Sequence, residues 1–196
     1  IQYIIILFMF LAGTNFVLIY FGITGKIKKI IQDTEFKWYL SLISSFAIIV
    51  TITLYFSVDL SATDVNHPQV YGKFESSFRH ALFQVVAIIT TTGFVTGDFI
   101  SWGPFLTMFF FGIMFLGGSS GSTSGGVKVL RHLILIKNGF LEFKRSLHPN
   151  AILPLRHNNS VVENPIIIHV LAFFILYLIL FIVGAGVLSL LGLDFV

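Results

Sequence analysis

Long apolar segments alternate with short polar ones along the whole chain. Residues 1–23, 38–58 and 165–191 each reach the length of about 20 residues that a helix needs to cross a bilayer. Two shorter apolar runs, residues 81–89 and 105–116, lie between the second and the last of these segments. The pattern predicts an all-α membrane protein in which some helices span the membrane and others only enter it.

The composition excludes several other classes of protein. The chain of 196 residues is 56% hydrophobic and 11% charged, whereas ordinary soluble domains carry about 25% charged residues. It contains no cysteine, which excludes disulfide and thiolate chemistry. The net charge of +3 is small, and the basic residues lie in short loops, so they indicate topology and not nucleic-acid binding. Both ends fall within or directly after an apolar run, so we expect a fragment of a longer polytopic protein.

The distribution of basic residues predicts which loops face the cytoplasm. Lysine is concentrated between the first two spans, and lysine and arginine recur around residues 138–164, so both loops are expected inside. The polar residues 59–73 are then external, and we interpret Asp59, Asp64 and His67 as solvated and not as a metal site. Trp38 with Tyr39, and Trp102, are expected to anchor helices at the membrane interface.

Residues 74–89 are predicted to form a helix whose apolar part, residues 81–89, is too short to cross the membrane. Ser76 and Ser77 are the expected caps, and Glu75 suits the positive end of the helix dipole. The sequence Thr90-Thr91-Thr92-Gly93-Phe94-Val95-Thr96 follows, and it must carry the chain back outward. Extended backbone at membrane depth must line water or lie inside protein. One such use is a row of carbonyl oxygens that replaces the water shell of a cation.

Two further interruptions fall inside apolar segments. Gly13-Thr14-Asn15 lies in the middle of the first span; it is either a packing patch of small residues or a site where Asn15 faces a polar pathway. Residues 117–126 consist of glycine, serine and threonine and break the third span, which resumes at Val127. A phosphate-binding loop is disfavoured because Val127 separates Gly126 from Lys128 and breaks the Walker pattern. A flexible link and a mobile gate in a pore stay open as interpretations.

Three motifs together carry a resemblance. They are Thr91-Thr92-Gly93-Phe94 after a short helix, the Gly/Ser run followed by Val127-Lys128, and His148-Pro149-Asn150-Ala151 with Pro154. As a set they resemble the Trk/Ktr/HKT superfamily of potassium uptake proteins, in particular the Trk-type bacterial membrane subunit. That family carries four span–pore helix–span repeats around one pore in a potassium-channel-like fold. The resemblance implies a partial chain: residues 1–37 end the second repeat, 38–137 form the third, and 138–196 begin the fourth.

The resemblance also implies the functional residues. The backbone carbonyls of Thr91, Thr92, Gly93 and Phe94 would form the third quarter of a selectivity filter, with potassium at Thr92 and Gly93. The Gly/Ser run would be the intramembrane gate, with Lys128 and Arg131 as residues associated with it. The gate residues implied in this way are Gly117, Gly118, Gly121, Ser122, Thr123, Gly125 and Gly126.

Potassium uptake across the inner membrane is the function that the resemblance implies. The chain itself is expected to bind no cofactor, and K⁺ is its transported ion. The resemblance further implies a homodimer, a cytosolic nucleotide-binding regulatory subunit, and the other repeats of the same chain as partners. Two alternatives stay open: a polytopic membrane enzyme using Asp98, His132 and His148, and a non-conducting structural subunit in which residues 90–94 are helical or face lipid.

Overall fold

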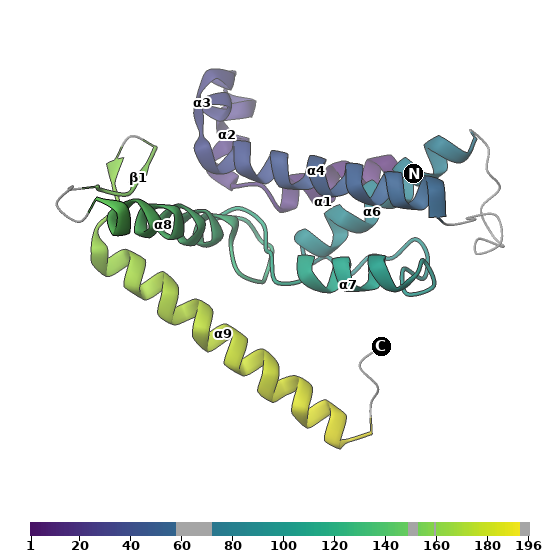
Figure 1. Cartoon of the computed structure of the whole chain (residues 1–196). Coiled ribbons are helices and arrows are strands. Elements are labelled where there is room, and N and C mark those ends of the chain that lie inside the picture. The colour runs from purple at the N-terminus through teal and green to yellow at the C-terminus, as the bar shows by residue number, and fades with distance from the viewer. Residues whose placement is uncertain (58–71, 149–152, 159, 193–196) are drawn as a thin grey trace. The chain divides into compact units, whose positions relative to one another are not determined.

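The structure is a computed structural model that describes residues 1–57, 72–148, 153–158 and 160–192. It divides into two compact units, residues 1–130 and residues 131–196. The first unit contains α1 (Gln2–Ala12), α2 (Phe16–Ile23), α3 (Ile27–Gln32), α4 (Thr34–Ser57), α6 (Lys73–Ile89) and α7 (Pro104–Ile113). α8 (Val129–Leu147) begins at the end of that unit, and the second unit continues with β1 (Arg156–His157), β2 (Ser160–Val161) and α9 (Asn164–Leu190) (Figure 1).

Two helices, α4 and α9, are long and apolar enough to cross a membrane. They confirm the spans predicted over residues 38–58 and 165–191, although α4 begins four residues earlier, at Thr34. The first predicted span is not straight. α1 and α2 meet at an angle of 112° because the helix breaks at residues 13–15, where Asn15 caps α2 by accepting a hydrogen bond from the Val17 amide at 2.8 Å.

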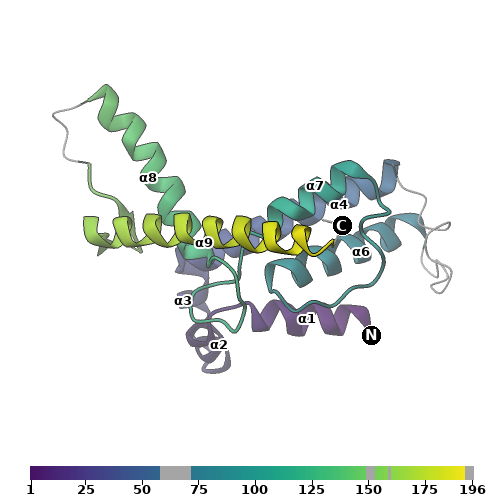
Figure 2. The same ribbon diagram turned by 90° about the horizontal axis from the view of Figure 1, so that it is seen from below.

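The short helix α6 lies in the middle of the first unit. It contacts α1, α4 and α7, and Figure 2 shows it between α1 on one side and α4 with α7 on the other. The residues that it buries on these contacts include Ala81, Phe83, Val85, Val86 and Ile89. A helix of 17 residues that is enclosed in this way is a core element and does not need to present an apolar surface to lipid.

The start of α6 differs from the prediction. Gly72, with φ of +93°, is the N-cap residue, and Glu75 lies in the first turn as expected. Ser76 and Ser77 are buried and do not cap the helix; the Ser77 hydroxyl instead donates to the Lys73 carbonyl at 2.9 Å. The serine pair was misassigned because a hydroxyl can also be satisfied by the carbonyl four residues earlier in its own helix.

The third predicted span is broken, as the sequence indicates. Pro104 occupies the first turn of α7, a position that suits proline, and residues 117–126 contain no helix. α8 then continues to Leu147, so residues 138–147, predicted as loop, are helical. A short antiparallel hairpin of β1 and β2 also falls in the predicted loop and adds two small strands to an otherwise helical chain.

Two of the predicted interface aromatics are core residues. Tyr39 is fully buried, its ring stacks on Phe10 at 5.3 Å between centroids, and its hydroxyl donates to the Phe10 carbonyl at 3.3 Å. Trp102 is 5% exposed and packs against Phe110, with 6.0 Å between ring centroids. Aromatic rings bury more apolar surface than most side chains, so they serve protein–protein packing as readily as an interface.

A substitution at Gly13 tests how tightly the bend between α1 and α2 packs against its neighbours. A methyl group at this position would collide with the Tyr39 hydroxyl and lie 2.5 Å from Cγ2 of Thr90. Overpacking of this kind costs about 1–3 kcal/mol, so Gly13→Ala should lower the melting temperature of the full-length protein in detergent. Gly22→Ala is the matched control, since its methyl group would lie 3.5 Å from Ile30. Equal melting temperatures for the two variants would contradict tight packing at Gly13.

Candidate functional site

The turn that ends α6 redirects the chain. Thr91 donates its amide to the Ile88 carbonyl at 3.0 Å, and Thr92 donates to the Ala87 carbonyl at 3.1 Å. This pair of bonds is a Schellman motif, which needs a left-handed residue just after the helix. Thr91 fills that position with φ of +52°. Glycine is the usual residue there, and a β-branched residue in this region is an outlier that costs about 1–3 kcal/mol.

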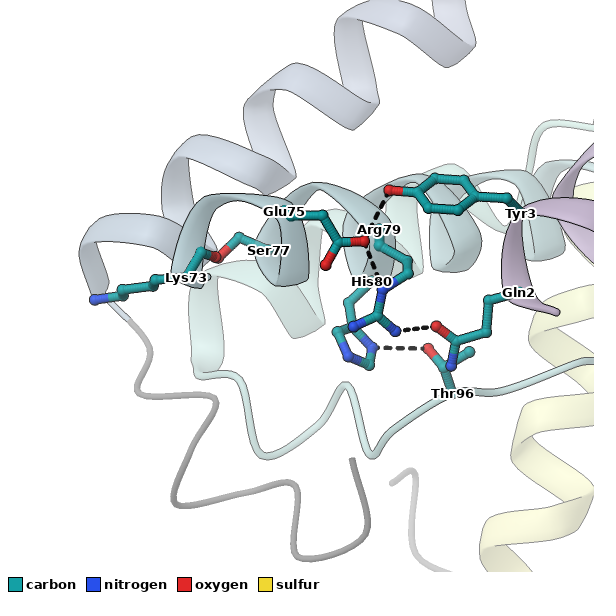
Figure 3. A network of polar contacts seen from close by, with 8 residues as sticks. All are labelled: Gln2, Tyr3, Lys73, Glu75, Ser77, Arg79, His80 and Thr96. Atoms are coloured by element: carbon teal, nitrogen blue, oxygen red, sulfur yellow. Dashed lines mark hydrogen bonds and ion pairs between the residues drawn. The ribbon is translucent and has the colours of Figure 1, made fainter. Parts of the chain in front are cut away.

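Residues 91–96 form a non-helical segment, called the return strand here, that leads back along α6. The Oγ1 of Thr96 lies 3.1 Å from Nδ1 of His80, which is two and a half turns before the end of the helix (Figure 3). The return strand therefore begins at the end of α6 and reaches a residue near the middle of the same helix.

The predicted filter residues lie on this strand. Gly93 has φ of +74°, a conformation that a side chain would strain. Thr91, Gly93 and Phe94 are exposed and Thr92 is half-buried, so one side of the strand is free of protein contacts within the described residues. A pocket of about 290 Å³ adjoins the strand and is lined by Gln84, Ala87, Ile88, Thr91, Gly93, Phe94, Val95, Phe99 and Met114.

The Gly/Ser loop, residues 117–126, is closed by its own hydrogen bonds. The Gly117 amide donates to the Val127 carbonyl at 2.8 Å, and the Gly118 amide donates to the Ser124 hydroxyl at 2.8 Å. The two ends of the loop thus lie side by side, with a parallel bridge between Leu116 and Val127. The glycines permit this approach, because a methyl group on Gly117 would collide with the Gly125 carbonyl.

The loop is also bonded to the break between α1 and α2. The Ser119 amide donates to the Gly13 carbonyl at 2.9 Å, and the Thr123 amide and hydroxyl donate to the Ala12 carbonyl at 3.3 and 3.0 Å. In return, the Phe16 amide donates to the Gly121 carbonyl at 3.2 Å. Two interrupted spans therefore satisfy each other's exposed backbone groups, so the loop is held in place on this side.

One bond joins the loop to the strand. The Gly125 amide donates to the Thr91 hydroxyl at 2.7 Å. The loop therefore lies against Thr91, the first residue of the strand. His80 contacts the other end of the strand, at Thr96. The sequence-predicted filter and gate residues, 34 positions apart at this bond, are brought together.

Charged side chains hold the loop at two points. Glu35, 6% exposed at the start of α4, accepts hydrogen bonds from the amide and the hydroxyl of Ser120, the latter at 3.0 Å. Lys128 donates to the carbonyls of Ser122, at 3.2 Å, and Ser124. Arg131, predicted together with Lys128, has its guanidinium carbon 3.6 Å from the centroid of the Phe173 ring. Lys128 thus contacts the loop, while the contact seen for Arg131 is with α9.

Sequence reasoning missed Glu35 and His80 as parts of this site. Glu35 adjoins a lysine-rich loop, and no spacing or motif connects it to Ser120, 85 residues later. The described ranges contain no group of three His, Asp or Glu side chains able to hold a metal ion. Asp59, Asp64, His67 and most of the His148-Pro149-Asn150-Ala151 motif lie outside the described residues.

These features define an integral membrane protein with long apolar helices, a short buried helix followed by a non-helical return strand, and an apolar segment broken at residues 117–126. The chain belongs to the TrkH family, described as "Cation transport protein", whose sequence model matches residues 1–196. The chain is therefore part of an inner-membrane protein, and its family is one of transport proteins and not of enzymes. The non-helical geometry of residues 90–94 also removes the helical form of the structural-subunit alternative.

Similar proteins agree with this assignment. The chain is 33% identical over 192 residues to the Trk system potassium uptake protein TrkH of Escherichia coli K12, which covers 97% of this chain and 38% of that protein. It is 34% identical over 189 residues to TrkG of the same strain, covering 96% and 36%. The crystal structure of the potassium transporter TrkH from Vibrio parahaemolyticus matches with a TM-score of 0.83 at 30% identity, covering 98% of this chain and 40% of that one. The chain thus spans about two fifths of the length of these relatives.

The bonds from Glu35 predict how firmly the loop is held. Hydrogen bonds to a charged group contribute about 1.5–3 kcal/mol each, so Glu35→Ala should speed amide exchange in residues 117–126 by about tenfold or more, because 1.4 kcal/mol is a factor of ten. Hydrogen–deuterium exchange of the full-length protein in detergent measures this. Glu142→Ala removes an exposed ion pair with Arg145 and is the control. Unchanged exchange at Ser119 and Ser120 would show that Glu35 does not hold the loop.

Proposed function

We propose that the full-length protein containing this chain takes up potassium ions across the inner membrane through a pore. The observation that carries the proposal is the return strand of residues 91–96, which is not helical, lies beside a short buried helix and leaves Thr91, Gly93 and Phe94 exposed. Backbone in this geometry offers carbonyl oxygens to a dehydrated cation. Membership of a cation transport family and relatives named as potassium uptake proteins support the choice of ion.

The strand is proposed as one quarter of the selectivity filter. Thr91, Thr92, Gly93 and Phe94 contribute backbone carbonyls, and potassium binds at Thr92 and Gly93. The positive φ of Gly93 supports its role as the filter glycine, since a side chain there would be strained and would narrow the ion path. The C-terminal end of α6 carries about half a negative charge next to the strand, which favours a cation.

The Gly/Ser loop is proposed as the gate on the cytoplasmic side of the filter. Its bond to Thr91, at the end of the strand that adjoins α6, supports this position, and its hydrogen bonds with Gly13 and Glu35 support one defined conformation, which we take to be the closed one. A passive link would need no such bonds. Lys128 adds a cation that stabilises the loop through the carbonyls of Ser122 and Ser124, and Arg131 is the second residue associated with the gate.

The remaining parts of the pore come from elsewhere in the full-length protein. Residues 1–37 are proposed to end a second repeat, residues 38–137 to form a third, and residues 138–196 to begin a fourth. A homodimer and a cytosolic nucleotide-binding regulatory subunit complete the proposed assembly. These partners would meet the lysine-rich α3 and the basic end of α8, which the charge distribution assigns to the cytoplasmic side.

Substitution of Gly93 tests the filter. Gly93→Ser adds a side chain at a positive φ, which costs about 1–2 kcal/mol, and should lower the preference for potassium over sodium about tenfold. Rubidium uptake into liposomes, with potassium and sodium as competitors, measures the preference. Gly97→Ser is the matched control: it lies on the same loop, its φ is not positive, and its Cβ would meet Trp102 at 3.7 Å. Unaltered competition in Gly93→Ser would exclude Gly93 as a filter residue.

Shortening the loop tests the gate. Deletion of residues 120–122 removes the contacts with Glu35, Phe16 and part of those with Lys128. We expect several-fold faster rubidium uptake at equal protein content, because the path below the filter stays open. A folded variant with wild-type flux would rule out gating by this loop.

A further inference from the structure

His80 is a buried polar residue that the filter and gate just described do not use. It lies in the N-terminal half of α6 with 1% of its surface exposed. The Gly/Ser loop contacts the chain at the other end of the helix, at Thr91. Imidazole is seldom buried this deeply without a hydrogen-bonded role, because a polar group loses its water on burial. The position of its ring therefore needs an explanation.

The explanation lies in the return strand. Nδ1 of His80 is 3.1 Å from Oγ1 of Thr96, and either atom is the donor, depending on the histidine tautomer. In Figure 3 the imidazole ring extends from α6 toward the strand, and Thr96 meets it from the opposite side. The bond joins residues 16 positions apart at the outer end of the strand. The inner end is fixed separately, by the turn at Thr91.

The surroundings of His80 hold its ring in one orientation. Trp102, itself 5% exposed, packs edge-on against the imidazole with 6.4 Å between centroids. The preceding residue, Arg79, bonds to Glu75 and Gln2 (Figure 3). Glu75 also accepts from the Tyr3 hydroxyl at 3.0 Å, which fastens the start of α6 to α1. The helix that carries His80 is thus itself fixed.

A second polar residue lies on the same face of α6. Gln84 follows His80 by four residues, so the two side chains lie one above the other along the helix. Gln84 is 2% exposed and lines the pocket beside Gly93 and Val95. Of the buried polar side chains of α6, His80 and Gln84 are the two that adjoin the return strand, whereas Ser76 and Ser77 lie nearer the start of the helix.

We propose that His80 is a positioning residue for ion selectivity: its bond to Thr96 fixes the outer end of the residue 91–96 strand and so the spacing of the carbonyl oxygens. The inference rests on the proposed function, since it assigns a role within that filter. Both ends of a short strand must be held if its carbonyls are to keep one spacing. Thr91 supplies the inner attachment and His80 the outer one.

The bond contributes to selectivity by restricting motion. A strand that is attached only at Thr91 adjusts its carbonyls to a smaller ion, and the discrimination between potassium and sodium falls. One neutral hydrogen bond changes an equilibrium about three- to tenfold, so a loss of that size in the preference for potassium is expected. The rate of uptake should change less, because the carbonyls themselves remain.

The test uses the full-length protein in liposomes and measures the ratio of the sodium concentration to the potassium concentration that halves rubidium uptake. His80→Phe keeps the ring and removes its nitrogens, and Thr96→Val keeps the shape and removes the hydroxyl. Each should lower the ratio three- to tenfold, and the double variant should fall no further than either alone. His80→Asn places an amide close to the position of Nδ1, and Thr96→Ser keeps the hydroxyl, so both should retain most of the preference.

The ratio does not depend on how many molecules fold. If His80 had a merely structural role, its loss would lower the rate of uptake but leave the ratio unchanged. His169→Phe, on the exposed surface of α9, is the matched control for the same substitution. Wild-type ratios in both His80→Phe and Thr96→Val would overturn the inference. If His80→Phe does not fold, Thr96→Val decides alone. Wild-type protein without a preference for potassium would instead overturn the proposed function.

Discussion

Peptide groups that leave a helix inside a membrane must find partners within the protein, since each unsatisfied group costs several kcal/mol in lipid. This chain breaks two of its membrane segments, at residues 13–15 and at residues 117–126, and the two breaks are paired. Carbonyls of Ala12 and Gly13 accept from the loop, and the Phe16 amide donates back to it. Either break alone would be unstable, so the bent pair α1–α2 and the Gly/Ser loop are best understood as one structural element.

The rest of the candidate site is built outward from that element. Glu35, in the first turn of α4, and Lys128, just before α8, hold the loop by hydrogen bonds. The loop in turn supports Thr91, whose left-handed conformation is costly and needs such support. The strand then runs back along α6 to His80. Each step depends on glycine where backbones approach closely, as at Gly117, and on buried aromatic packing around Tyr39 and Trp102.

Much of this architecture was predictable from periodicity and from segment length. The spans now seen as α4 and α9, the short helix α6 and the interruption at residues 117–126 all follow from the positions of apolar runs, glycine and proline. The bend at Gly13 was not predictable, because a single Gly-Thr-Asn sequence is compatible with a continuous helix. The helical end of α8 was hidden by its polar composition. Tyr39 and Trp102 were wrongly predicted to lie at the membrane interface, because the exposure of a side chain depends on which other helix packs against it. The partnership of Glu35 with Ser120 depends on tertiary proximity alone.

The hydrogen bond from Gly125 to Thr91 has a mechanical consequence. It joins the proposed gate loop directly to the proposed filter strand, through one amide and one hydroxyl. If the loop withdraws to let an ion pass, it takes away the partner of a residue whose backbone is already strained. Conductance and discrimination would then not be independent properties: a state that passes ions fastest would hold its ion-selecting backbone least firmly, and crosstalk between the two would be inherent in the fold.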